Sequence, residues 1–126
     1  MPIYAYFYDG DFIKARQETL FEWRWSDYDD YESKYGYRSN PDAAVMRYKV
    51  GSYLEGLGVL VRRRLIDPSF VDDLMSGIII RYWEKFSLQI LEMRKRLNYP
   101  QAGEQIECLY NQIKPIAEKQ HPELRK

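Results

Sequence analysis

The 126-residue sequence contains one cysteine and one histidine, and its 19 basic side chains equal its 19 acidic ones in number. A single cysteine excludes an internal disulfide framework and a multi-cysteine metal cluster. The single histidine, His121, lies in a charged tail, which excludes most metal sites and histidine-based catalytic arrangements. A net charge near zero argues against a broad surface for nucleic acid or anionic membrane, because such a surface needs a basic excess.

Long hydrophobic runs are also missing. No segment approaches the roughly 20 apolar residues that a helix needs to cross a bilayer. Residues 1–8 lack the basic region and the small-residue cleavage site of a signal peptide. We therefore expect a cytoplasmic protein with no transmembrane segment.

Apolar residues recur every three or four positions after residue 40, as they do on one face of an α-helix. The first series predicts a helix over 41–64, with Asn40 as its N-cap. The second predicts a helix over 68–97, capped by Asp67 and ended by Pro100. Because only two or three residues separate these helices, we expect them to form a long antiparallel αα-hairpin.

The ends of the chain give weaker patterns. A fourth helix should follow Pro100, and Pro115 should end or kink it. Apolar positions between Phe12 and Trp23 indicate a first helix. The sequence allows this first helix to continue as far as Lys34, and a connector then leads to Asn40. Taken together, the pattern predicts an all-α fold, a single domain over 1–126 built as a bundle of about four helices, with an arm at 1–10 and a frayed tail at 118–126.

A stripe of small and charged residues runs along the helix at 41–64. Its members are spaced by four, three and four positions: Gly51, Glu55, Gly58 and Arg62. Because glycine has no side chain, Gly51 and Gly58 let another helix approach closely. Packing within the chain is the favoured interpretation, and a subunit interface or a ligand groove are the alternatives. A carboxylate in such a groove needs a partner, for which an arginine is the obvious candidate.

Three consecutive arginines, Arg62, Arg63 and Arg64, suggest contact with phosphate or carboxylate groups. Successive helical residues point about 100° apart, however, so the three side chains do not share a face. Solvated cations at a helix end are the favoured interpretation, and anion or nucleic-acid contact is the alternative. The acidic segment 26–37 contains Tyr28 and Tyr31, which suit either a protein interface or a plain connector.

Catalytic motifs are absent from the sequence. It has no phosphate-binding glycine loop and no Glu-x-x-His pair for a two-metal centre. It also has no serine or cysteine nucleophile with a general base at a suitable spacing. The aromatic cluster around Trp83 has the spacing of a helix core. Acidic residues on the long helices are expected to be solvated: Asp72, Asp73, Glu92, Glu104 and Glu107. We therefore expect no catalytic residue, no bound metal and no cofactor.

Several local motifs resemble a family of small prokaryotic helical domains of unknown function. The sequence has Leu54-Glu55-Gly56-Leu57-Gly58 on one helix, an Ile66-Asp67 turn, and Trp83-Glu84 on the following long helix, with Arg94 near its end. The resemblance covers roughly residues 40–113. It implies the same helical core and brings no activity, substrate or catalytic residue.

These observations favour a non-catalytic protein–protein interaction module that self-associates, with a homodimer favoured. The glycine stripe and the tyrosines Tyr28 and Tyr31 are its candidate contacts. One alternative is a nucleic-acid-binding regulator that uses Arg62–Arg64. The other is a small-ligand binder or enzyme with a pocket near Tyr53, Glu55 and Trp83.

Overall fold

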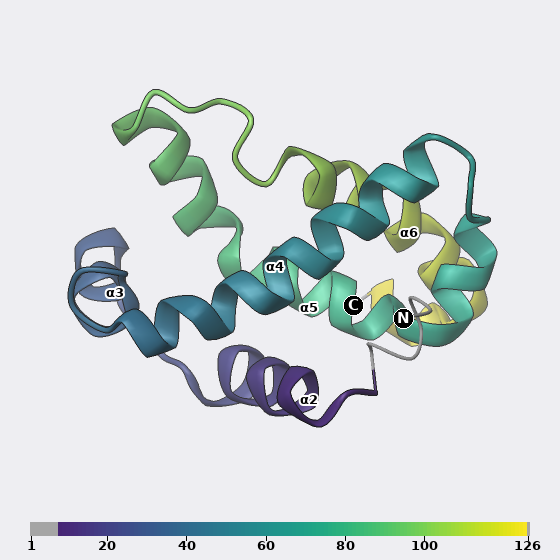
Figure 1. Cartoon of the computed structure of the whole chain (residues 1–126). Helices are drawn as coiled ribbons and strands as arrows, with labels where there is room; N and C mark the ends of the chain where they lie inside the picture. The colour runs from purple at the N-terminus through teal and green to yellow at the C-terminus, as the bar shows by residue number, and fades with distance from the viewer. Residues whose placement is uncertain (1–7, 126) are drawn as a thin grey trace. The chain divides into compact units, whose positions relative to one another are not determined.

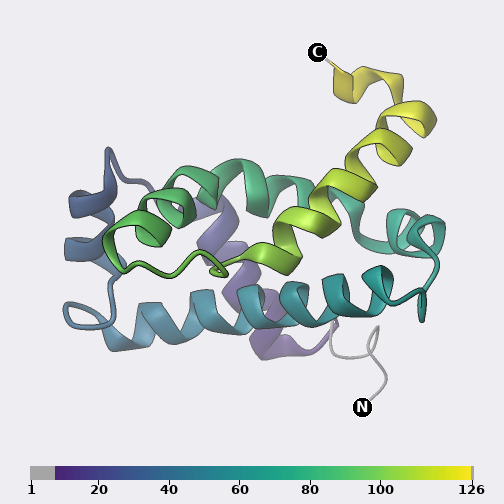
Figure 2. The ribbon, with the colours of Figure 1, turned by 90° about the horizontal axis from the view of Figure 1, so that it is seen from above.

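The computed structural model describes residues 8–125, which form helices and no strand. The expected all-α class is therefore confirmed. Five α-helices, one π-helix and one 3-10 helix follow one another along the chain (Figures 1 and 2): α2 (Gly10–Gln17), η1 (Glu18–Glu22), α3 (Tyr28–Tyr35), α4 (Pro41–Arg62), α5 (Pro68–Arg96), α6 (Glu104–Gln120) and η2 (Pro122–Arg125).

Helix α4 begins where the sequence predicts. The backbone N–H of Ala43 donates to Asn40 Oδ1 over 3.2 Å, so Asn40 acts as the N-cap. The helix ends two residues earlier than expected, because Arg64 adopts a positive φ of 61°. The N–H groups of Arg64 and Leu65 then bond to the carbonyls of Val61 and Leu60, which satisfies the last free carbonyls of the helix.

Helix α5 begins where the sequence predicts and ends one residue earlier, at Arg96, and Asp67 caps it by accepting from the Ser69 N–H over 2.7 Å. The helix is not continuous, however. Met75 has φ −152° and ψ 22°, so α5 consists of two helical segments that meet there. A Ser-Gly pair, Ser76-Gly77, follows the break, and such pairs are common at sharp helix kinks. The periodicity over 68–97 does not predict this break.

Helix α6 continues past Pro115, where the sequence predicts an end or a kink, and reaches Gln120. The proline side chain is exposed, while Ile113 before it and Ala117 after it are fully buried. Burial on both sides of Pro115 keeps the second half of the helix in place. The predicted tail at 118–126 therefore begins with a helical turn of α6 and continues with η2.

The amino-terminal part differs more from the prediction. The expected first helix is divided into α2 and the π-helix η1, and the segment at 26–40 contains a separate helix, α3. Asp27 begins α3 by accepting from the Asp30 N–H over 2.8 Å. Of the predicted arm at 1–10, residues 1–7 lie outside the described residues, and Gly10 already belongs to α2.

The chain divides into two compact units, the first ending at Tyr53 and the second beginning at Leu54. The boundary lies inside α4. The first unit contains α2, η1, α3 and the first half of α4, and the second contains the rest of α4 with α5, α6 and η2. The single domain over 1–126 stays a prediction.

Candidate functional site

The glycine stripe of α4 meets the first turn of α6. A Cβ atom at Gly58 would overlap the backbone carbonyl oxygen of Gln105 and lie 2.9 Å from its carbonyl carbon. One turn away, the Glu55 carboxylate accepts the Ile106 N–H over 2.9 Å. The groove predicted at Glu55 and Gly58 is therefore filled within the chain, and the partner of Glu55 is a helix-start amide rather than the expected arginine. Gly51, in the first unit, is buried.

The arginine cluster does not act as one group. The Arg62 side chain donates from Nε to Gln105 Oε1 over 3.0 Å, which adds a further contact between α4 and the start of α6. Arg63 and Arg64 are exposed and lie in the turn that ends α4. The structure thus gives Arg62 a packing role and leaves Arg63 and Arg64 on the surface.

Arg94 holds the connection between α5 and α6. Its guanidinium donates to the Ala102 carbonyl over 2.7 Å and to Glu107 over 2.9 Å. Next to this connection, Gly103 has a positive φ of 67°, and a Cβ there would lie 2.9 Å from the Ile90 side chain. Glu107 was expected to be solvated, but it is half-buried and paired with Arg94, so this prediction is wrong for it. The reason is that the turn between the helices brings its carbonyls and the first turn of α6 up to Arg94.

A second polar link joins the middle of α5 to α6. Lys114 Nζ and the Tyr110 hydroxyl both donate to Glu84 over 2.7 Å. The Lys114 hydrogen bond lowers the pKa of the Glu84 carboxyl, and the same contact raises the pKa of Lys114. Burial raises the pKa of Tyr110. The arrangement is a partly exposed structural contact that ties the two helices together.

Aromatic rings form the core of the first unit. Trp23 stacks on Tyr35 with ring centroids 4.1 Å apart, and Trp25 meets Tyr31 edge-on at 4.8 Å. Arg47 lies over the Tyr31 ring and donates to its hydroxyl over 3.0 Å. Tyr31 is only 2% exposed, so this candidate contact residue belongs to the core.

The other tyrosines of the predicted contacts have different surroundings. Tyr28 is half-buried in the first turn of α3. Tyr53 packs on Phe12 with centroids 4.9 Å apart, and burial raises the pKa of Tyr53 to about 12. In the second unit, Trp83 is buried and lies 6.2 Å from the Tyr110 ring. Tyr53 and Trp83 therefore act as packing residues within their own units.

The outer face of α5 carries exposed leucines. Leu88 is 80% exposed and Leu91 is 39% exposed, one turn apart near the middle of the second helical segment. Glu84 lies four residues before Leu88 and Lys95 four residues after Leu91, and both are exposed. This face was not among the predicted contacts, although its spacing of four, three and four is visible in the sequence. We call Glu84, Leu88, Leu91 and Lys95 the outer α5 face.

Asp72 contradicts the expectation that the acids of α5 are solvated. It is 4% exposed, and neither of its carboxylate oxygens has a hydrogen-bond partner. The spacing could have indicated this, because Asp72 precedes Met75 by three residues and Ile79 by seven, and both are buried. Asp73, the next residue, is exposed as predicted.

Within residues 8–125, no group of three or more histidine, cysteine, aspartate and glutamate side chains has the arrangement of a metal site. No helix of this described part is long and apolar enough to cross a membrane. Cys108 is a half-buried free thiol.

Comparison with family models gave a match over residues 11–113 to a family described as "Domain of unknown function (DUF4760)". This match agrees with the resemblance to domains of unknown function found at residues 40–113 and extends it toward the amino terminus. Comparison with curated proteins and with solved structures gave no match.

Proposed function

The chain belongs to the DUF4760 family of domains of unknown function, and from this premise we propose that it is a non-catalytic interaction module that self-associates as a homodimer. The observation that carries the proposal is the exposure of Leu88 and Leu91 on a helix face with a charge of opposite sign at each end. Exposed neighbouring apolar side chains with a polar rim are typical of protein–protein contact sites.

The order of residues on the outer α5 face suits a symmetric pair. Glu84 lies four residues before Leu88, and Lys95 lies four residues after Leu91. The spacing is therefore symmetric about the centre of the series. If two copies of α5 lie antiparallel across a two-fold axis, Leu88 of one copy faces Leu91 of the other. The same arrangement brings Glu84 of one copy opposite Lys95 of the other, which satisfies the self-complementarity of a two-fold interface.

Such a contact is small. Two leucines per copy contribute about 1.5–3 kcal/mol each when fully buried, before the cost of association. Dissociation constants on the order of 10–100 micromolar are therefore expected. The glycine stripe has no part in this interface, because α6 covers Gly58.

The finer features of the predicted fold belong to the same proposal. Helices α4 and α5 would form the antiparallel hairpin of a bundle of about four helices. The short connection from Arg62 to Pro68 supports this, since short links join antiparallel neighbours. We propose that the module is cytoplasmic, which the single free cysteine supports, and that it is prokaryotic, as the resemblance to small prokaryotic helical domains implies.

Sedimentation equilibrium over a range of protein concentrations tests the self-association. We expect the wild-type chain to form a dimer that Leu88→Glu and Lys95→Glu both weaken, the first by removing apolar contact and the second by opposing two acids. Tyr48→Glu is the matched control, because Tyr48 is 74% exposed on α4, outside the outer α5 face. A wild-type monomer at 200 micromolar, about twice the weakest expected dissociation constant, would refute the proposal.

A titration with labelled single-stranded and duplex DNA at low salt tests the alternative that the chain binds nucleic acid. If Arg63 and Arg64 contact phosphates, DNA binding appears at low salt and falls steeply as the salt concentration rises. Absence of binding in both titrations removes that alternative.

A further inference from the structure

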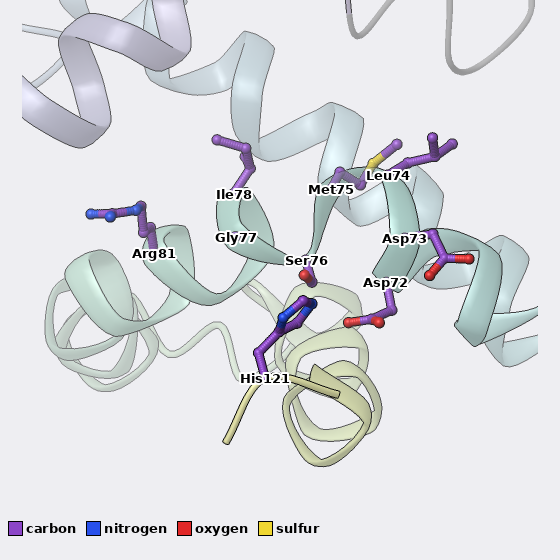
Figure 3. Close-up of a pocket in the computed structure, with 9 residues that line it drawn as sticks. All are labelled: Asp72, Asp73, Leu74, Met75, Ser76, Gly77, Ile78, Arg81 and His121. Carbon is purple, nitrogen blue, oxygen red and sulfur yellow. The ribbon is translucent and has the colours of Figure 1, made fainter. Parts of the chain in front are cut away.

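A pocket of about 300 Å³ lies at the break in α5, and residues 72–78, Arg81 and His121 line it. Figure 3 shows Ser76 at the break between the two helical segments. The pocket belongs entirely to the second unit, and its volume lies at the lower end of the range for small-molecule sites.

The Asp72 carboxylate is the chemical feature that distinguishes this pocket. The side chain is 4% exposed and neither oxygen has a hydrogen-bond partner. A buried carboxylate without a partner is strongly unfavourable, whereas a carboxylate paired with a hydrogen-bonding cation is much less so. The pocket therefore contains a carboxyl group whose hydrogen-bonding capacity is unused.

The neighbouring side chains leave the carboxylate available on the pocket side. In Figure 3 the Asp72 carboxylate points toward the His121 ring, while Arg81 points away from both. The His121 ring has its own contact, with Nδ1 3.8 Å from Glu123 Oε1. Asp73 is exposed and lies on the far side of Asp72 from His121. Within residues 8–125, neither Asp72 oxygen has a hydrogen-bond partner, so no cation of this part of the chain is hydrogen-bonded to it.

We propose that this pocket binds a small organic cation with N–H donors, such as a primary ammonium group, and that Asp72 is its counter-ion. Ammonium donors form short, charge-assisted hydrogen bonds with a carboxylate and remove its unpaired charge. A metal ion is a poorer match, because no group of three or more candidate ligand side chains was found among the described residues. The kink at Met75 creates the space, since an unbroken helix would continue through it.

Titration of the ¹⁵N-labelled full chain with n-butylammonium chloride tests this site. We expect saturable amide shifts confined to residues 72–81 and 121, and no such shifts with tetramethylammonium, which has the same charge and no N–H donor. Asp72→Asn should weaken n-butylammonium binding at least about tenfold, because it removes a charged hydrogen-bond partner. Glu104→Gln is the matched control: it removes one acidic charge from an exposed residue of the same unit that does not line the pocket, and it should change the affinity less than about twofold.

A second measurement keeps the test decisive if Asp72→Asn does not fold. In wild-type protein labelled with ¹³C at the aspartate carboxyl carbons, the Asp72 signal should move on addition of n-butylammonium, while the signal of Asp67, which does not line the pocket, stays in place. Equal responses to both ammonium salts, equal effects of the two variants, or an unmoved Asp72 signal at 50 millimolar, a concentration on the order of weak-ligand saturation, would each overturn the proposal.

Discussion

The two units of the chain hold their helices together by different kinds of contact. In the first unit, short helices are joined by aromatic rings, with Trp23 stacked on Tyr35 and Arg47 over Tyr31. In the second unit, α4 contacts the first turn of α6 at two points. The backbone at Gly58 lies close to the backbone of Gln105, and the Glu55 carboxylate accepts the Ile106 N–H. The comparison teaches that short helices rely on a few large side chains, whereas long helices can be positioned by contacts at their ends.

Trp23→Ala should give the largest effect, because it removes the ring at the centre of the first unit. Trp23 is buried, and we expect a loss of about 3–4 kcal/mol in the free energy of unfolding, measured by urea denaturation. Tyr37→Ala is the control, since Tyr37 is 73% exposed, and it should cost below about 0.5 kcal/mol. Similar small losses in both variants would mean that the aromatic rings do not hold the first unit together.

Gly58→Ala should give the next largest effect, because the added Cβ would overlap the backbone of Gln105 and force α6 to move. We expect a loss of about 2–3 kcal/mol by urea denaturation. Gly56→Ala in the same helix is the control, as nothing lies within 4 Å of its Cβ position, and it should stabilise the chain by up to about 1 kcal/mol. If both variants are stabilised, close backbone approach is not what positions α6.

Arg64→Gly should stabilise the chain, in contrast to the two losses above. Arg64 holds a positive φ of 61° at the end of α4, and glycine adopts that conformation without the Cβ penalty of about 1 kcal/mol. Arg63→Gly removes the same charge at a residue whose N–H still bonds to Val59 in the helical pattern, and it should be destabilising. Thermal unfolding of the two variants distinguishes a backbone effect from a charge effect.

The smallest expected effect concerns the pH dependence of the two units. Lys114 lowers the pKa of Glu84, and the Ser26 amide is the main cause of the lowered pKa of Asp30. A carboxyl with a lowered pKa in the folded chain contributes stability above its unfolded pKa, and this contribution is lost as the pH falls through the folded value. Both contributions should therefore decline on acidification from the unfolded pKa near 4 downward.

Glu84→Gln and Asp30→Asn measure these contributions through urea denaturation between pH 6 and pH 3. The Glu84 contribution should be below about 1 kcal/mol and should shrink in 0.5 M salt, because an exposed ion pair is screened. The Asp30 contribution should respond less to salt, because its main partner is a neutral backbone amide. Equal salt sensitivity at the two sites would contradict the assignment of causes.

Much of the two long helices, α4 and α5, was predictable from local signals. Asn40 and Asp67 mark helix starts in the sequence, and both act as caps in the structure. The break at Met75 was not predicted, because Ser76-Gly77 permits a kink without requiring one. The polarity of the Asp72 side chain predicts exposure, whereas its helical position is that of a core residue, and the structure buries it.

The candidate contacts were less predictable than the helices. The stripe at Glu55 and Gly58 indicated a close approach, but spacing alone could not show that the first turn of α6 fills it. Tyr31 lay in a segment with no clear periodicity, and only the packing of Trp25 and Arg47 around its ring places it in the core. The exposure of Leu88 likewise depends on which face of α5 its neighbours cover.

The sequence by itself determined that this protein is helical and where its long helices begin, because helix periodicity and caps act over a few neighbouring residues. Only the tertiary structure decided which residues share a contact: that α6 begins on Gly58, that Arg94 holds the turn before α6, and that Asp72 is buried at a break in α5. These pairings join residues distant in sequence, and their partners are set by the packing of whole helices rather than by local preference.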